Sequence, residues 1–400
     1  MNYLIVLQLL INDFSNKNKN DTLAKSNNIL AQQSLWLKLE QSGEIPPPMW
    51  DGASAFDEKR HLFYIFGGLN GSYPVDFPHP VFSVLDVNTL VWRNLVAPDT
   101  PTPRAEALLW VDRRTGNIFL TGGHGPFRRG LDLTFNTTSM YNVATSTWHS
   151  IPQTLDQQYS ANRSTEAKVV GKKAYAIFGT SSTLPAFVNR PRGLQTGVIE
   201  FDLMQGGWKN VTMKGVIPTP RGHHHLGYSR DKHALYTYGG YTKDPLGNST
   251  FGERNYLGDL QEFDLTTGYW TELIPATNVT PGKRDNAKII HVDKKALILT
   301  GGSSWTGQNY NDVWRFDFKT KLWSRVIVAA QIDPLTNKQI TPPIPIGAYY
   351  FTKDDENGNH EFWMWGGSSK IKNSWFKFSN CLMDSKDCTS KIYYLSGRYD

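Results

Sequence analysis

The chain has 400 residues, of which 39% are hydrophobic and 20% charged, and its formal net charge is +6. This balance is typical of a globular protein and excludes a chain too polar to bury a core. The positive charge is not gathered into one basic run, so we expect no nucleic-acid partner. No apolar stretch reaches roughly 18 residues, so we expect no membrane-spanning helix in this chain.

The N-terminus contains a short apolar run, Tyr3–Ile11, with the length of a signal-peptide core. No Lys or Arg precedes this run, and no small-residue cleavage site follows it. A signal peptide, an N-terminal strand and a misassigned start all remain open interpretations. Residues 12–28 are polar, rich in Asn and without period, which predicts a disordered leader.

An apolar segment that ends in glycine recurs six times. Its aromatic and β-branched residues predict a buried strand, and the glycines indicate a strand end that needs positive φ or close packing. In the third copy, Thr180 stands in place of the second glycine. The copies are LFYIFGG (62–68), NIFLTGG (117–123), KAYAIFGT (173–180), ALYTYGG (234–240), ALILTGG (296–302) and EFWMWGG (361–367).

Each copy is followed by an alternating segment, which predicts a second strand with one buried face. These segments are FSVLDV (82–87), SMYNV (139–143), GVIEFDL (197–203), LQEFDL (260–265), VWRFDF (313–318) and SWFKFS (374–379). After a short turn, a Trp opens a third strand in every copy except the sixth: Trp92, Trp148, Trp208, Trp270 and Trp323. The missing segment has a counterpart at the other end of the chain, SLWLKL (34–39) with Trp36.

A fourth strand is predicted before each glycine strand, and in four copies an arginine opens it: Arg104, Arg163, Arg221 and Arg284. Four strands in each of six units predict a radial array of antiparallel sheets, which is a β-propeller. Residues 34–39 would then supply the outer strand of the last blade and close the ring, so that no open sheet edge remains.

The glycine pair, the aromatic residue of the alternating strand and the Trp after a short turn resemble kelch repeats. The resemblance covers about residues 34 to 379. It implies an all-β, six-bladed kelch-like β-propeller of four-stranded antiparallel blades, closed by the N-terminal strand. The predicted domains are residues 1–30 (signal segment and leader), 31–380 (propeller) and 381–400 (C-terminal tail). Kelch propellers serve as scaffolds, receptors and enzymes, so the fold does not fix the function.

Strand directions place the loops between blades and the loops after each glycine pair on one face of the propeller. We call it the long-loop face, because it carries Leu69–Pro80, His124–Asn136, Ser181–Gln195, Tyr241–Asn255 and Val328–Ile344. Arginine and aromatic side chains there suit an anionic or glycan-like partner. The binding-face candidates are His124, Arg128, Arg129, Arg190, Arg192, Tyr241 and Arg254 in these loops, together with Trp305 after the fifth glycine pair. The four repeated arginines are candidates too, although one register in four repeats also indicates a structural hydrogen bond within each blade.

The most tempting chemical motif is His223-His224-His225. On a strand the outer two face one way and His224 the other, so the three cannot share one metal ion, and His224 is expected to be structural. Glu106 and Glu166 are the best pair for acid–base chemistry, although they lie two and three residues after their arginines and could face opposite ways. We expect no metal and no cofactor.

Copper-radical oxidases resemble this architecture but need a cysteine cross-linked to a tyrosine beside the metal. The two cysteines here, Cys381 and Cys388, lie beyond the last predicted strand. In an oxidising compartment they would form a local disulfide, and in the cytosol they would remain thiols. Sequons at Asn136, Asn162, Asn210, Asn248 and Asn278 are glycosylation candidates, and their number is close to that expected by chance.

The sequence therefore predicts a non-catalytic kelch-repeat binding module that is extracellular and takes a protein or glycan on its long-loop face. One alternative is a secreted carbohydrate-active enzyme of the oxidase, epimerase or mutarotase kind, and another is a cytosolic scaffold. Convergence of acidic and basic side chains with shifted pKa values in one pocket would favour the enzyme.

Overall fold

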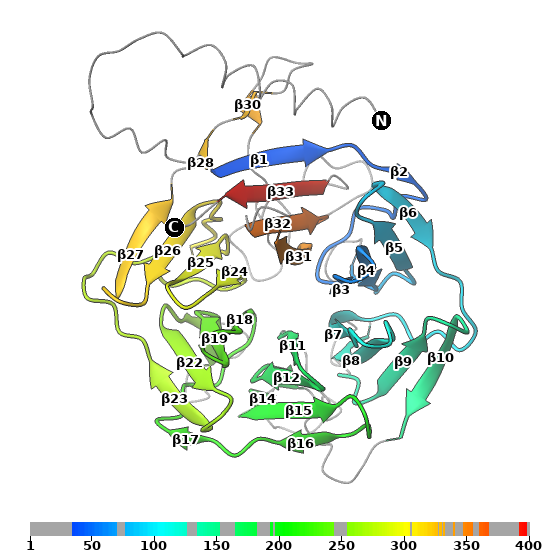
Figure 1. The fold of residues 1–400 in the computed structure, drawn as a ribbon, viewed down its shortest axis with the longest axis horizontal. Coiled ribbons are helices and arrows are strands. Elements are labelled where there is room, and N and C mark those ends of the chain that lie inside the picture. Colours follow the sequence, from blue (N-terminus) through cyan, green and yellow to red (C-terminus); the bar gives the residue numbers. More distant parts are fainter. Residues whose placement is uncertain are drawn as a thin grey trace. The chain divides into compact units, whose positions relative to one another are not determined.

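The strands are arranged as sheets that follow one another around a ring (Figure 1). The computed structural model describes residues 34–69, 77–125, 134–152, 165–181, 193–194, 197–243, 254–304, 306–326, 328–329, 331–332, 339–340, 347–354, 360–367 and 392–397. All of them belong to one compact unit, Gln33–Asp400. Within these ranges the regular structure is entirely β, and no helix there is long and apolar enough to cross a membrane.

Five sheets repeat one antiparallel plan, in which successive strands run from the middle of the ring outward. Their innermost strands are β3 (Ala53–Asp57), β7 (Ala105–Val111), β11 (Ala167–Val170), β18 (Leu226–Ser229) and β24 (Lys288–Val292). The second strands are β4 (Leu62–Phe66), β8 (Ile118–His124), β12 (Lys173–Ile177), β19 (Ala234–Tyr238) and β25 (Ala296–Thr300). The third strands are β5 (Phe82–Asp86), β9 (Thr138–Asn142), β15 (Val198–Asp202), β22 (Leu260–Asp264) and β26 (Val313–Asp317). The outer strands are β6 (Val91–Asn94), β10 (Thr147–Ile151), β16 (Trp208–Asn210), β23 (Tyr269–Glu272) and β27 (Leu322–Val326). This plan is that of a propeller blade.

A further sheet combines strands that are far apart in the sequence, in the order β28-β1-β33-β32-β31. Its innermost strands are β31 (Tyr349–Asp354) and β32 (His360–Trp365). Next come β33 (Ile392–Gly397) and then β1 (Ser34–Leu39), which pairs antiparallel with β33. The sequence had placed the third strand of this sheet at residues 374–379. Those residues lie outside the described ranges, and β33 holds the third position.

Short parallel strands extend the outer edges of three sheets. β2 (Ser42–Gly43) pairs with β6, β17 (Lys214–Gly215) pairs with β23, and β28 (Val328–Ala329) pairs with β1. Three two-stranded ribbons complete the described strands: β13 (Thr180–Ser181) with β14 (Gly193–Leu194), β20 (Tyr241–Lys243) with β21 (Arg254–Tyr256), and β29 (Gln331–Ile332) with β30 (Gln339–Ile340). An outer strand that is already paired offers fewer free backbone groups to another chain.

The hydrophobic core lies between neighbouring sheets. Each buried cluster combines two of them: one joins the sheet of β4 to that of β8, and another joins the sheet of β19 to that of β25. The Trp that opens each outer strand is buried in such a cluster, as Trp148 is against Phe66 of the preceding sheet. The repeated Trp is therefore the side chain through which one sheet packs on the next.

The glycine pairs end the second strands with two successive positive φ angles, for example 62° at Gly239 and 88° at Gly240. The structure corrects the alignment of the third copy with the others. There the two positive φ angles belong to Phe178 (49°) and Gly179 (110°), so Phe178 replaces the first glycine and Thr180 follows the pair. The hydrogen bond of Gly179 to the carbonyl of Arg221, at 3.0 Å, matches that of Gly240 to Arg284, at 2.9 Å.

Candidate functional site

A cavity of about 1000 Å³ lies in the middle of the ring and is lined by the innermost strands. Its lining runs along these strands from beginning to end, for example from Glu106 to Arg113 beside β7 and from His223 to Asp231 beside β18. We call the two ends of this central cavity the start end, where the innermost strands begin, and the turn end, where hairpin turns lead to the second strands.

Backbone hydrogen bonds link neighbouring sheets at the start end. Asp51, Glu106, His223 and Asn286 occupy the same position in their sheets and have φ between 52° and 55°, and Gly347 has φ of 61°. The N–H of Glu106 donates to Asp51 O (2.6 Å), that of Asp51 to Gly347 O (2.8 Å) and that of Asn286 to His223 O (2.7 Å). Residues other than glycine seldom adopt this left-handed backbone conformation, and those that do are concentrated at functional sites. Here the conformation links neighbouring sheets and places polar side chains in the cavity lining.

His223 lies between two carboxylates at the start end. Its Nδ1 is 3.3 Å from Asp285 Oδ2 and its Nε2 is 3.5 Å from Glu106 Oε1, and the ring meets Tyr241 edge to face. Burial lowers the pKa of His223, but the interactions with Asp285 and Glu106 outweigh it and raise the pKa to about 10. The imidazole is therefore a charged group at neutral pH and balances one of the two carboxylates.

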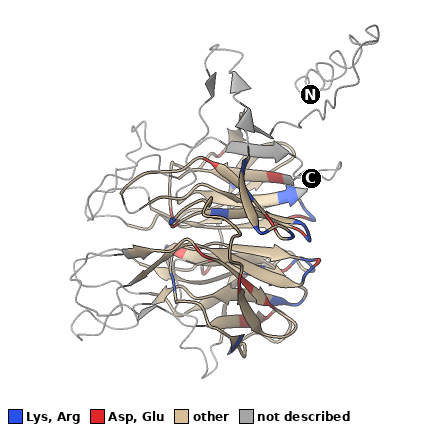
Figure 2. Ribbon diagram, turned by 90° about the vertical axis from the view of Figure 1, so that its left-hand side faces the viewer, with Lys and Arg blue, Asp and Glu red and all other residues tan. Residues whose placement is uncertain are grey.

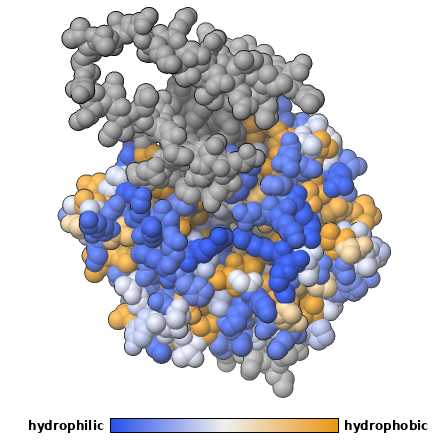
Figure 3. Space-filling view, viewed as in Figure 1, coloured by the Kyte–Doolittle hydropathy of each residue, from blue (hydrophilic) through white to orange (hydrophobic). Residues whose placement is uncertain are grey.

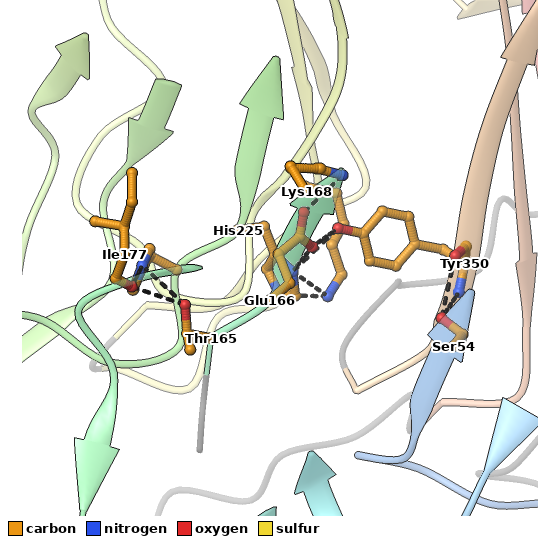
Figure 4. A network of polar contacts seen from close by, with 9 residues as sticks. Ser54, Thr165, Glu166, Lys168, Ile177, His225 and Tyr350 are labelled. Atoms are coloured by element: carbon orange, nitrogen blue, oxygen red, sulfur yellow. Dashed lines mark hydrogen bonds and ion pairs between the residues drawn. The ribbon is translucent and has the colours of Figure 1, made fainter. Parts of the chain in front are cut away.

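A second polar cluster joins three sheets around Glu166 (Figure 4). Lys168 Nζ lies 2.6 Å from Glu166 Oε1, and His225 Nδ1 lies 2.9 Å from Glu166 Oε2. The hydroxyl of Tyr350 also donates to Oε2. Burial raises the pKa of the Glu166 carboxyl, but Lys168 and His225 together hold it well below its ordinary value. Glu166 is thus an ionised acceptor with both oxygens occupied.

Lys288 belongs to the same cluster and contacts both His225 and Tyr350. Its ammonium contacts His225 Nε2 and lies 4.7 Å from the centre of the Tyr350 ring. Burial, followed by the charge of Lys288, lowers the pKa of His225 to about 4, so the imidazole is neutral at pH 7. A neutral ring that donates from Nδ1 to Glu166 can accept from Lys288 at Nε2, and this assigns the Nδ1–H tautomer.

Two groups of the central cavity titrate near neutrality. Burial, and then the charge of Glu106, raises the pKa of Asp51 to about 7. Burial lowers the pKa of Lys288 to about 7, against the opposing carboxylates of Glu166 and Asp51. Near pH 7, the Asp51 carboxyl and the Lys288 amine at the start end are therefore each present in both the charged and the neutral form. They can contact a polar ligand that carries charge of either sign.

Three of the four repeated arginines lie in the described part of the chain, and each of these three is buried and makes a structural hydrogen bond within its own sheet. Arg104, Arg221 and Arg284 are 0–3% exposed. Each guanidinium donates to the carbonyl of the first glycine of its own sheet, at 2.9–3.1 Å. Arg221 and Arg284 also form ion pairs at 2.7 Å, with Asp259 and Asp312 respectively. These contacts give the three described guanidinium groups a structural role within their sheets, and contact of these arginines with a ligand stays a prediction.

The other predicted binding residues divide into two groups. Tyr241 lies at the start end against His223. The side chains of Arg128, Arg129, Arg163, Arg190, Arg192, Arg254 and Trp305 lie outside the described part of the chain. The same holds for Cys381, Cys388, Asn162 and Asn248, whereas Asn136, Asn210 and Asn278 are described and exposed. The long-loop face and the disulfide therefore remain predictions.

The histidine triplet divides as expected for a strand. His223 and His225 line the cavity, while His224 is buried and its Nε2 lies 2.9 Å from the carbonyl of Ile177. Burial, followed by the charge of Arg221, lowers the pKa of His224 to about 3. Among the described residues, no group of three His, Cys, Asp or Glu side chains is placed to hold a metal ion.

Sequence reasoning missed Asp51, Asp285, Lys288 and Tyr350. Glu106 and Glu166, which it chose, both line the cavity but belong to different clusters. A signal for one of the missing residues was present: Lys288 stands four positions after Arg284, as His225 does after Arg221, so an alignment of the repeats on their arginine superposes Lys288 on His225. Tyr350 has no arginine to mark its position, because the sixth copy lacks one.

Comparison with known proteins finds a matching family model and several similar proteins. A family model described as the KLHDC2/KLHL20/DRC7 kelch-repeats domain matches residues 13–189 and 187–341. Kelch domain-containing protein 10 of Rattus norvegicus is 31% identical over 296 residues, 71% of this chain and 53% of the relative. The protein of that name in Homo sapiens is 24% identical over the same length, with 71% and 49% covered. Acyl-CoA-binding domain-containing protein 4 of Arabidopsis thaliana is 27% identical over 271 residues, 54% of this chain and 37% of the relative. The chain thus spans about half the length of the kelch domain-containing relatives that it matches.

Proposed function

This chain belongs to the kelch-repeat family, and from that premise we propose that it is a non-catalytic interaction module whose protein partner binds at the start end of the central cavity. One observation carries the proposal: charged and polar side chains from different sheets converge there within hydrogen-bond distance. Glu106, His223, Glu166 and Lys288 come from sheets that the fold holds rigidly, so a ligand meets a preformed surface.

The state of Glu166 supports binding in preference to catalysis. A general acid must hold a proton near neutral pH, and the depressed pKa of Glu166 keeps this carboxylate ionised. Its Oε1 forms an ion pair with Lys168, and its Oε2 accepts from His225 and Tyr350. The predicted long-loop face extends from the same end of the innermost strands, and we propose that its loops add contacts to the partner.

The test is a peptide library displayed on phage and panned against the folded chain. Peptides that it enriches are then measured against Glu106→Gln and Lys288→Met, which remove a charge at the start end with little change of shape. We expect each to weaken binding by about tenfold or more. Arg325→Gln, on the exposed face of β27, is the matched control and should leave affinity unchanged. Enriched peptides that bind the start-end variants as tightly as the parent would overturn the proposal.

A second function is favoured by the two groups that titrate near pH 7, Asp51 and Lys288. An acidic and a basic group with shifted pKa values share one cavity, which is typical of active sites and supports the alternative of a carbohydrate-active enzyme. Exchange between the anomers of common aldoses, followed by NMR, tests this function. An acceleration that Asp51→Asn abolishes would establish it, and no acceleration by the parent chain would remove it.

We also propose that the sheet of β31, β32, β33 and β1 is a sixth blade, and that the N-terminal strand closes the propeller. The antiparallel pairing of Leu37 with Tyr394 supports closure. Buried clusters on both sides of this sheet support a blade, one with the sheet of β24 and the other with the sheet of β4. On the second side, the ring of Phe351 stacks on Phe56 at 4.2 Å.

The compartment is a separate proposal. Extracellular location accords with the exposure of the sequons at Asn136, Asn210 and Asn278, since a glycan needs an accessible asparagine. Intact mass of the chain made in a eukaryotic host, before and after glycosidase, tests it. An unglycosylated chain recovered only from inside cells would turn the search to cytoplasmic partners.

A further inference from the structure

The turn end of the central cavity differs in charge from the start end. The hairpin turns that follow the innermost strands carry exposed cations. Among the described residues, five of these side chains form no ion pair: Lys59, Lys172, Arg230, Lys294 and Lys295. They come from four different sheets, so positive charge is distributed around this end and not confined to one turn.

The acids of the same turns are largely neutralised by their neighbours. Asp57 pairs with Arg60 at 2.7 Å, Asp112 with Arg114 at 2.8 Å and Glu58 with Arg113 at 3.2 Å. Asp293 accepts from the backbone N–H groups of residues 295 and 296 at 2.6 and 2.7 Å. Asp293 keeps its negative charge despite these hydrogen bonds, and neither Asp293 nor the exposed Asp231 forms an ion pair with a Lys or Arg of the described turns, so two acids stand against the five unpaired cations. The unpaired cations therefore leave a surplus of positive charge at this end.

Of the five unpaired cations, Arg230 belongs to the lining of the central cavity. Glu58, Arg113, Arg230 and Asp231 line the central cavity at its turn end. Seen from the side, blue segments of Lys and Arg and red segments of Asp and Glu lie together along the right-hand edge of the ring (Figure 2). The space-filling view along the ring axis shows hydrophilic residues collected around its middle (Figure 3). Arg113 is paired with Glu58 in this lining, and the other unpaired cations, Lys59, Lys172, Lys294 and Lys295, stand on the turns outside the cavity. Positive charge spread over several neighbouring turns attracts a ligand of the opposite sign.

We propose that the turns at this end form a docking surface for an acidic segment of a partner protein. It is separate from the site at the start end and does not depend on it. The unpaired cations stand one or two to a turn, with paired acids between them. An Asp/Glu-rich chain can place single carboxylates at the cations and neutral residues beside Glu58 and Asp231. A nucleic-acid backbone, with a phosphate at every nucleotide, would bring some of its charge against these acids.

The test measures fluorescence anisotropy of a labelled peptide made of four Glu-Asp-Gly repeats, with four Gln-Asn-Gly repeats as the neutral probe. The face variant combines Lys59→Gln, Lys172→Gln, Arg230→Gln and Lys294→Gln. The control variant removes the same charge from exposed cations outside these turns: Arg93→Gln, Lys214→Gln, Lys283→Gln and Arg325→Gln. At an ionic strength of about 50 mM, the acidic peptide should bind the parent and the control variant. The face variant should bind it at least about tenfold more weakly, which is a loss of about 1.4 kcal/mol.

Three results would overturn the proposal. The acidic peptide could fail to bind the folded parent, it could bind both variants equally, or a single-stranded oligonucleotide could bind the parent more tightly than the peptide and be lost in the face variant. Equal thermal midpoints of the two variants show that both are folded. Phage peptides selected for the start end should bind the face variant normally, which separates failure of this proposal from failure of the other.

Discussion

At the residue scale, the arginine before an innermost strand connects two neighbouring sheets. The carbonyl of Arg284 accepts from the N–H of Gly240 in the preceding sheet at 2.9 Å. Its guanidinium donates within its own sheet to Gly301 O and to Asp312. Arg221 repeats both contacts with Gly179 and Gly239. One buried side chain thus fixes the end of its own sheet, while its backbone holds the end of the sheet before it.

Replacing Arg284 by Met should strongly destabilise the fold. The change leaves the Asp312 carboxylate and the Gly301 carbonyl without their buried donor, and removal of one partner from a buried ion pair costs about 3–5 kcal/mol. Urea unfolding measures the loss of unfolding free energy. Arg325→Gln, an exposed cation in the same sheet, should cost less than about 0.5 kcal/mol. A loss below about 1 kcal/mol for Arg284→Met would contradict this role.

His223 should make stability depend on pH above neutrality. Its pKa in the folded chain, about 10, lies above the ordinary value of 6.5, so the folded state holds the proton more tightly. The resulting stabilisation is complete below pH 6.5 and is lost as the pH rises toward 10. Unfolding free energies of the parent and His223→Gln, measured between pH 6 and 9.5, should converge by more than about 1 kcal/mol. Parallel curves would show that Glu106 and Asp285 do not hold this proton.

At the element scale, the glycine pairs allow the backbones of neighbouring sheets to approach closely. A Cβ added to Gly239, which has φ of 62°, would lie 2.3 Å from the carbonyl oxygen of Arg284. Gly171 has nearly the same φ, 61°, and no atom lies within 4 Å of its added Cβ. The two glycines share backbone conformation and differ in the space around them, so they separate conformational strain from steric exclusion.

Gly171→Ala should lower the unfolding free energy by about 1 kcal/mol, which is the penalty for an alanine in the left-handed conformation where space is open. Gly239→Ala carries the same penalty and also displaces the backbone of the next sheet, so it should cost at least about 2 kcal/mol more. Thermal and urea unfolding of the two variants, measured side by side, provide the comparison. Equal losses of unfolding free energy in the two variants would mean that small backbone shifts relieve the contact between the added Cβ and the carbonyl oxygen of Arg284.

The strands of the repeated elements could be predicted because their signals are local. Alternation and the Gly-Gly ends placed β4, β19 and β25 nearly to the residue. The third copy was misaligned because Phe178 adopts a conformation that the sequence pattern reserves for glycine. The third strand of the sheet with β32 was not foreseen at residues 392–397, because strand pairing depends on register between distant segments.

The candidate site was less predictable than the strands for the same reason. That His223 and His225 share a face follows from the period of a strand. The contact of Glu166 with Tyr350 joins residues 184 positions apart, across sheets whose order around the ring is set by the whole fold. The shifted pKa values of Asp51 and Lys288 depend on burial in the cavity, which no local pattern reports.

At the scale of the whole molecule, pairing of β1 with β33 should make the two ends of the described chain open together. Hydrogen exchange measured by mass spectrometry tests this expectation. Peptides that cover residues 34–39 and 392–397 should show equal protection, because each strand holds the amides of the other. The exposed segment at 277–279 is the control and should exchange at once. Immediate exchange of residues 34–39 beside a protected 392–397 would contradict closure by the N-terminal strand.

The pairing of β1 with β33 also has a consequence during synthesis on the ribosome. Leu37 leaves the ribosome more than 350 residues before Tyr394, its partner in the sheet. At about 5–20 residues per second, β1 waits for roughly 20 to 70 seconds with one edge unpaired, while the intervening sheets can already form. Throughout that interval the nascent chain exposes a strand edge that can pair with another chain or with a chaperone. Aggregation during expression should therefore respond to the rate of translation as well as to the stability of the finished fold.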